Sequence, residues 1–262
     1  MSHRPIVHYI ATRPDGTVPP TCGSAAEYAH WIGEPIPTVN LAAHLGQAVD
    51  HPDPGRRWYD DSPFSYFRMY TKPGEILERV QWPARLFVVE PRGETGNWGA
   101  PHYPYWALSH QLKVIEETEA WRAFGHRGDK VLDVIDRQLP ELARQWAEEW
   151  AADPDGTRQR YDAWSERLNN TGALSDWVYW KACSSRRAAA AEQAQFLART
   201  AAEKSAAAVL DDLDAVAVIS RRAQGLTAAE LLHDRLRRSR REKEILALLR
   251  GVDVDTPQSA AA

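Results

Sequence analysis

The chain has 262 residues, of which 44% are hydrophobic and 26% are charged, and this composition excludes a wholly disordered protein. A formal net charge of −4 excludes a molecule that is basic over its whole surface. The two cysteines, Cys22 and Cys183, lie far apart and provide neither a disulfide framework nor a cysteine-based zinc site.

The N-terminal part of the chain predicts short elements separated by turns. β-Branched and aromatic residues favour a strand over 6–11, and the proline, aspartate and glycine of 13–16 favour a turn after it. A capping-box pattern at 24–27 predicts a short helix that ends near Gly33. Residues 40–49 are expected to form a second short helix.

Three further strands are predicted, over 66–70, 85–90 and 112–116. The second of them, Arg85–Glu90, is almost continuously apolar, so we expect a central strand that is buried on both faces. The proline and the glycines between 91 and 96 are expected to end it.

After Gly128 the spacing of the apolar residues becomes that of helices. The residues that step by three or four and share one face are Val131, Ile135, Leu139, Leu142, Trp146 and Trp150. Pro140 interrupts this run and suits the first turn of a new helix, where its missing N–H group is tolerated. A turn is expected at 153–156, and a third helix is expected to end at 169–172.

Residues 173–224 contain no glycine or proline, which permits either one long helix or two helices joined by a bend. Gly225 is expected to end this helical stretch. A second capping-box pattern at 227–230 predicts a last helix, which stops at Gly251.

These elements predict an α+β protein with a small mixed α/β sheet domain at 1–126, an extended helical region at 127–254 and a disordered tail at 255–262. The N-terminus lacks the apolar run of a signal peptide, and no stretch approaches the ~20 apolar residues of a membrane span. We therefore expect a cytoplasmic protein that does not bind a membrane.

Eight of the nine histidines lie at or before residue 126, a bias that catalysis near neutral pH would favour. His8 lies in the first predicted strand, Tyr66 and Tyr70 lie in the second, and Glu90 ends the buried third. This order of residue types resembles that of one class of ADP-ribosyltransferases, in which the histidine orients the nicotinamide ribose, a tyrosine stacks on nicotinamide and the glutamate stabilises the oxocarbenium-like state. The resemblance implies NAD as the cofactor. The alternative is a core histidine and an edge carboxylate. No metal-ligand spacing is present, so we expect no metal and, outside this hypothesis, no cofactor.

A basic segment lies near the end of the helical region. Its members are Arg235, Arg237, Arg238, Arg240, Arg241 and Lys243. On a helix these charges would surround the axis, and Leu236 is the only apolar residue between His233 and Ile245, so about two turns could not be packed in a core. We expect this segment to remain a solvated helix or to bind an acidic partner, nucleic acid included.

The run Arg85–Glu90, with Gly93 and Glu94 after it, has the pattern R-L-F-x-V-E-x-x-G-E, and Lys113–Glu117 is a second strand of K-V-x-E type. This combination resembles uncharacterised proteins of actinobacteria and their phages, many of which continue into helices rich in alanine and arginine. The resemblance covers 85–118, and the chain lacks the Cys-Gly-x-His-x-Cys element that precedes the strand in that pattern. It implies an origin and a two-part organisation, and it carries no catalytic residues.

Three functional hypotheses follow. The first is an accessory or interaction protein whose helical region binds a protein partner or a second copy of the chain. The second is an ADP-ribosyltransferase-like enzyme, and the third is nucleic-acid binding through 235–243. The first is preferred, because the chain contains no nucleophile elbow, P-loop or dinucleotide-binding glycine pattern.

Overall fold

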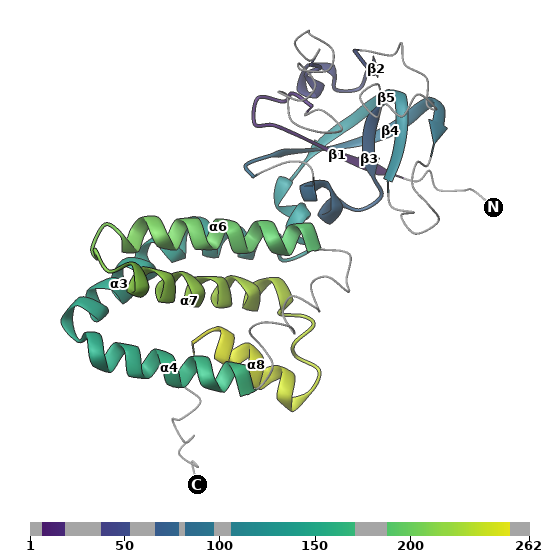
Figure 1. The fold of residues 1–262 in the computed structure, drawn as a ribbon. Coiled ribbons are helices and arrows are strands. Elements are labelled where there is room, and N and C mark those ends of the chain that lie inside the picture. Colours follow the sequence, from purple (N-terminus) through teal and green to yellow (C-terminus); the bar gives the residue numbers. More distant parts are fainter. Residues whose placement is uncertain are drawn as a thin grey trace. The chain divides into compact units, whose positions relative to one another are not determined.

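The computed structural model describes residues 7–18, 38–52, 66–78, 82–96, 106–170 and 188–251. The chain divides into two compact units, Met1–Ala123 and Phe124–Ala262 (Figure 1). The described part of the first unit is built on strands and that of the second on helices, which confirms the predicted α+β class. Among the described residues, no helix is both long enough and apolar enough to cross a membrane.

The first unit is a small antiparallel sheet. Its strands are β1 (His8–Thr12), β2 (Ala48–Asp50), β3 (Phe67–Tyr70), β4 (Arg85–Gly96) and β5 (Trp106–Thr118). The strand order is β2-β5-β3-β1-β4, and β4 also pairs with β5, so four strands close into a barrel with β2 alongside β5. Its short 3-10 helices are η1 (Leu41–His44), η4 (Pro73–Glu78) and η5 (Ala120–Phe124). Closure removes most of the free strand edges that would otherwise pair with other chains.

The barrel core is formed by alternate residues of the strands. Its members are Ile10, Leu41, Val49, Phe67, Met69, Phe87, Val89, Ala107, Leu112 and Val114. Leu86 and Phe87 are neighbours on β4, so they face opposite sides of the strand, and both are completely buried. The prediction that this strand is buried on both faces is therefore confirmed.

Strand β4 does not stop at the proline and glycines after Glu90, as predicted, but continues to Gly96. The register shifts by one residue between Arg92 and Thr95, which marks a bulge, and Gly93 has a φ of 69° that suits glycine. The Ser109 hydroxyl of β5 lies 2.6 Å from the Arg92 carbonyl oxygen beside this bulge. The glycine thus bends the strand without ending it.

The prediction of a helix over 40–49 is half correct. Asn40 caps the short helix η1 by accepting a hydrogen bond from the Ala42 N–H (3.0 Å), but the chain then enters strand β2. The strand predicted at 112–116 is the C-terminal part of the longer β5. The helix predicted from the capping box at 24–27 and the tail 255–262 lie outside the described residues.

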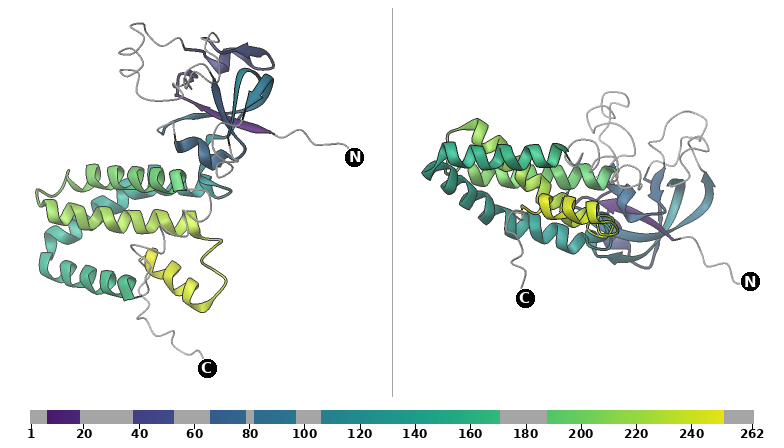
Figure 2. Two further views of the ribbon diagram at one scale, coloured as in Figure 1. Left: turned by 45° about the vertical axis from the view of Figure 1, so that its right-hand side comes forward. Right: turned by 90° about the horizontal axis from the view of Figure 1, so that it is seen from below.

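The second unit contains seven described helical segments. They are α2 (Gly128–Asp133), the π-helix η6 (Val134–Gln138), α3 (Leu139–Ala152), α4 (Pro154–Asn170), α6 (Ala188–Ala206), α7 (Leu213–Leu232) and α8 (Arg240–Leu249). Helices α6 and α7 lie side by side, and α8 lies beside α4 (Figures 1 and 2). The apolar face predicted from Val131 to Trp150 is confirmed, since all of its members are buried except the half-buried Leu142. Pro140 occupies the first turn of α3, as predicted.

Helix α6 packs through alanines. Those that recur every four residues and are at most 1% exposed are Ala190, Ala194, Ala198, Ala202 and Ala206. Four-residue spacing places them along one face, and their small side chains let the backbone of α6 lie close to its neighbours. The facing helix α7 buries Ala215, Ile219 and Ala223. The alanines that favour helix formation therefore also form its packing surface.

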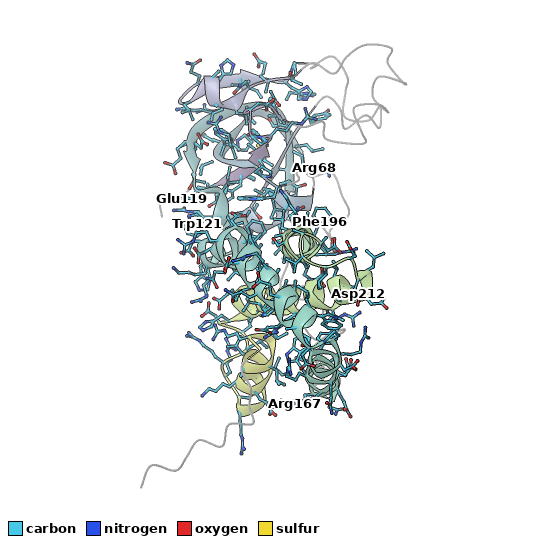
Figure 3. All side chains as sticks on the ribbon, turned by 90° about the vertical axis from the view of Figure 1, so that its left-hand side faces the viewer. Arg68, Glu119, Trp121, Arg167, Phe196 and Asp212 are labelled. Atoms are coloured by element: carbon cyan, nitrogen blue, oxygen red, sulfur yellow. The ribbon has the colours of Figure 1, made fainter. Side chains whose placement is uncertain are left out.

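The stretch without glycine or proline contains two described helices and not one. Helix α6 ends at Ala206 and α7 begins at Leu213. Asp212, labelled in Figure 3, caps α7 by accepting from the N–H groups of Asp214 (2.9 Å) and Ala215 (3.1 Å). The bend is thus set by an aspartate cap. Residues 173–187 lie outside the described part of the chain.

Two predictions at the end of α7 were wrong. Gly225 does not end a helix but lies inside α7, where the position of its missing Cβ would be 3.4 Å from the Leu249 carbonyl oxygen and 3.6 Å from the Trp164 ring. Thr227 does not cap a helix either, because its buried hydroxyl donates to the Ala223 carbonyl (3.0 Å). A glycine and a threonine that suit helix ends serve close packing here.

We predict that Leu236→Ala lowers the free energy of unfolding of the helical unit by about 2–4 kcal/mol. Leu236 is completely buried in a core cluster with Leu168, Leu232 and Ile245, so truncation leaves a cavity. The matched control is Leu213→Ala, because Leu213 is 81% exposed and its truncation should cost less than about 0.5 kcal/mol. Urea unfolding followed by helical circular dichroism measures both. Equal losses of unfolding free energy in the two variants would show that burial of Leu236 does not stabilise the helical unit.

Candidate functional site

The structure places His8 in the wall of the barrel. It is 8% exposed and lies directly opposite Val89 on β4, so the two side chains share the face that carries the barrel core. The position matches the alternative reading of a buried core histidine.

Glu90 follows Val89 on β4, and successive side chains of a strand point to opposite faces. Its carboxylate is 45% exposed and pairs with Arg92 at 3.3 Å. His8 and Glu90 therefore lie on opposite faces of the β1–β4 ladder, with one facing the core and the other facing solvent.

The two candidate tyrosines are also separated from His8. Tyr70 lies opposite Tyr9, the neighbour of His8, so it is on the other face of the sheet. The Tyr66 ring stacks on the His110 ring, with 4.0 Å between centroids and 28° between planes. An ADP-ribosyltransferase site would need the histidine, a tyrosine and the glutamate around one cleft. The described geometry does not bring these residues together, so we do not propose this activity.

The remaining histidines do not form a metal centre in the described part of the chain. The His51 ring meets Phe67 edge-on at 5.0 Å, and His126 belongs to the helical unit, where it contacts Asp234. Within the described ranges, no group of three or more histidine, cysteine, aspartate or glutamate side chains could hold a metal ion. Cys22 and Cys183 lie outside these ranges.

A row of buried polar groups beside β3 was not predicted from the sequence. The buried atoms are the hydroxyls of Tyr66 and Tyr70, Nε of Arg68 and both carboxylate oxygens of Glu75. Each of these residues takes part in further interactions. The alternation of Phe67 and Met69, which face the core, with polar neighbours was the available signal, but it is also typical of a solvent-exposed strand face.

The basic segment was expected to be a continuous helix, but the structure shows a break in it. α7 ends at Leu232, residues 233–239 form turns and bends, and α8 begins at Arg240. The Ser239 hydroxyl accepts from the Glu242 N–H (3.1 Å), and the Glu242 carboxylate accepts from the Ser239 N–H (2.9 Å). This is the capping box of the last helix, twelve residues after the predicted one. Leu236 is buried, so the segment is a turn that packs against the core through this leucine.

Five of the six basic side chains are exposed, and we call them the basic surface. They are Arg237, Arg238, Arg240, Arg241 and Lys243. Arg237 pairs weakly with Asp234 at 3.7 Å. Within the described residues, Arg238, Arg240 and Lys243 take part in no ion pair. Arg235, the sixth, is half-buried. The turn and the start of α8 thus carry three positive charges, on Arg238, Arg240 and Lys243, that form no ion pair with the described residues.

Glu230, near the C-terminal end of α7, is hydrogen-bonded to two arginines. Arg127, before α2, donates to one of its carboxylate oxygens, and Arg250, after α8, donates to the other at 2.7 Å. The Glu230 side chain is 13% exposed. Burial by itself would raise the pKa of Glu230, but the hydrogen bonds and charges of Arg127 and Arg250 outweigh it and hold the pKa below its ordinary value.

Asp234 lies four residues further on, between Glu230 and the basic surface. It contacts His126, lies 3.3 Å from Nδ1 of His233 and 3.7 Å from Arg237. Burial acts to raise the pKa of Asp234, but the hydrogen bond from His233 and the charges of His126 and Arg237 hold it below its ordinary value. Neither acidic residue was proposed as a site residue from the sequence, because the contacts with Arg127, Arg250 and His126 join residues about 20 to 100 positions apart.

Comparison with known proteins adds no relative to these observations. No protein-family model matches the chain, and neither curated proteins nor solved structures give a significant match. The resemblance to actinobacterial and phage proteins therefore stays a prediction.

We predict that Glu230→Gln lowers the free energy of unfolding of the helical unit by about 1–3 kcal/mol at neutral pH, because two charge-assisted hydrogen bonds weaken. The pKa of Glu230 is lower in the folded than in the unfolded chain. Its contribution is therefore complete above the ordinary carboxylate range and is lost as the pH falls toward the folded-state value. The variant should lose that part of the acid dependence.

Urea unfolding between about pH 3 and pH 7 measures this effect. The control is Glu148→Gln, which removes one exposed pair with Arg144 (3.1 Å) and should change stability by less than about 0.5 kcal/mol. A Glu230→Gln variant as stable as this control would show that the ion pairs do not hold the helices together.

Proposed function

We propose that the protein is a nucleic-acid-binding accessory protein whose helical unit contacts phosphate groups through the basic surface. The observation that carries this proposal is the concentration of five exposed basic side chains within residues 237–243 of a protein whose net charge is −4. Positive charge is therefore gathered at one place on a chain that is acidic elsewhere. Such an uneven distribution of charge attracts a polyanion to the basic surface and orients it there.

Three acidic residues near the basic surface, Glu230, Asp234 and Glu242, have partners of their own, while Glu244 is exposed beside Lys243 and offsets part of the positive charge. Glu230 accepts from two arginines outside the surface, and the Glu242 carboxylate accepts from the backbone N–H groups of Arg238 (3.0 Å) and Ser239 (2.9 Å). Asp234 is shared between two histidines and Arg237. Most of the positive charge on Arg238, Arg240 and Lys243 therefore remains available to a ligand.

The side chains of this surface are of the types that bind phosphate groups. Arginine binds phosphate oxygens with two parallel hydrogen bonds, and lysine supplies a compact positive charge. The segment 235–244 contains no aromatic, asparagine or glutamine residue that could stack on bases or read their edges. We therefore expect binding that depends little on the base sequence and strongly on the salt concentration.

The test is binding of the full chain to a fluorescent DNA duplex of mixed sequence, followed by anisotropy at several salt concentrations. The triple variant Arg238→Ala, Arg240→Ala, Lys243→Ala should bind at least about tenfold more weakly and should lower the slope of log K against log salt by about two to three. All three side chains are exposed, so the fold should be unaffected.

A matched control removes the same charges from other helices, in the triple variant Arg137→Ala, Arg199→Ala, Lys204→Ala. These side chains are exposed and lie outside the basic surface. The control should retain most of the affinity. Equal weakening in both variants, absence of DNA binding at low salt, or tighter binding to an acidic polypeptide than to DNA would each overturn the proposal.

A further inference from the structure

One carboxylate beside the basic surface is shared by two imidazole rings and a guanidinium group. His126 Nε2 contacts Oδ2 of Asp234, while Nδ1 of His233 and Nη2 of Arg237 face Oδ1 at 3.3 Å and 3.7 Å. His126 comes from the start of the helical unit, and the other two residues flank Asp234 at the end of α7. Asp234 thus has three basic neighbours, of which Arg237 belongs to the basic surface.

The charges of these neighbours respond differently to pH. An imidazole gains a positive charge as the pH falls through about 8 to 5, whereas a guanidinium is charged at all of these values. Of the three neighbours of Asp234, Arg237 carries a positive charge whether or not the imidazoles are protonated. When both rings are protonated, two imidazolium groups donate to the same carboxylate and reduce its attraction for Arg237.

We infer that His126, His233 and Asp234 form a proton-sensitive control of the basic surface, which strengthens polyanion binding as the pH falls. This inference rests on the proposed function. Protonation places positive charge beside the basic surface, and it frees Arg237 from Asp234 to contact phosphate. The protons come from solvent and form N–H bonds at the ring nitrogens, and no bond between heavy atoms of the protein changes.

Charged groups of α7 and α2 have partners of their own, and the half-buried Arg235 beside Asp234 also takes part in an interaction. Glu230, one helical turn before Asp234, is held by Arg127 and Arg250. Asp129 and Lys130, in the first turn of α2, lie 3.8 Å apart as a pair. Asp234 is therefore the carboxylate that responds when the histidines gain charge.

The exposure of the cluster suits a response to solvent pH. The His126 side chain is 68% exposed to solvent, whereas those of His233 and Asp234 are 23% and 29% exposed. The half-buried pair is screened less by salt than pairs on an open surface. His233 is also the C-cap residue of α7, where the helix dipole favours a positive charge.

The experiment measures the dissociation constant of the full chain for the DNA duplex at about pH 5.5 and about pH 8, at constant ionic strength. The wild-type chain is expected to bind about tenfold more tightly at the lower pH. The double variant His126→Gln, His233→Gln should lose most of this gain. The control His44→Gln, in the first unit, should keep it.

A second variant separates added charge from the release of Arg237. Asp234→Asn removes the carboxylate that attracts Arg237, so it should bind more tightly than wild type at about pH 8 and show a smaller pH ratio. If the double histidine variant keeps the full pH ratio, or if wild-type binding does not change with pH, the inference is overturned while the proposed function stands. Absence of binding at both pH values overturns both.

Discussion

The carboxylate of Glu230 joins three parts of the helical unit that lie far apart in the sequence. It accepts hydrogen bonds from Arg127, which precedes α2, and from Arg250, which follows α8, while Glu230 itself lies near the end of α7. The contact with Arg250 holds the C-terminal end of α8 beside the end of α7, and the segment 233–239 between the two helices forms a turn. That turn carries the first part of the basic surface, so the ion pairs inside determine which charges are presented outside.

Apolar contacts also hold the turn and α8 against the other helices. Leu236 is buried in the middle of the same turn, and Trp164 of α4 donates to the Leu248 carbonyl of α8 at 2.8 Å. Gly225 of α7 leaves room for the Trp164 ring and the end of α8. A highly charged segment is therefore attached to the core through one leucine, and its arginines can stay hydrated. The cost of burying charge is avoided, and the positive charge remains available for binding.

The barrel shows why a chemically reasonable order of residues does not make a site. A histidine, tyrosines and a glutamate occur along the chain in an order that some enzymes use, but strands alternate their side chains between two faces. In the observed register His8 lies opposite Val89, so Glu90 faces away from it. A register shifted by one residue would reverse this result. The register depends on how β1 pairs with β4, and this pairing cannot be deduced from local sequence.

Local sequence was sufficient wherever one signal dominated. The apolar run of β4, the helical spacing from Val131 to Trp150 and the charge of the basic segment were all determined by residue type and periodicity. Two capping-box patterns competed near the C-terminus, and only the tertiary structure decided between them. Thr227 is buried where α7 packs on its neighbours, whereas Ser239 is exposed at the start of α8. A cap needs a free helix end, and the location of helix ends depends on contacts between distant residues, such as that of Glu230 with Arg127.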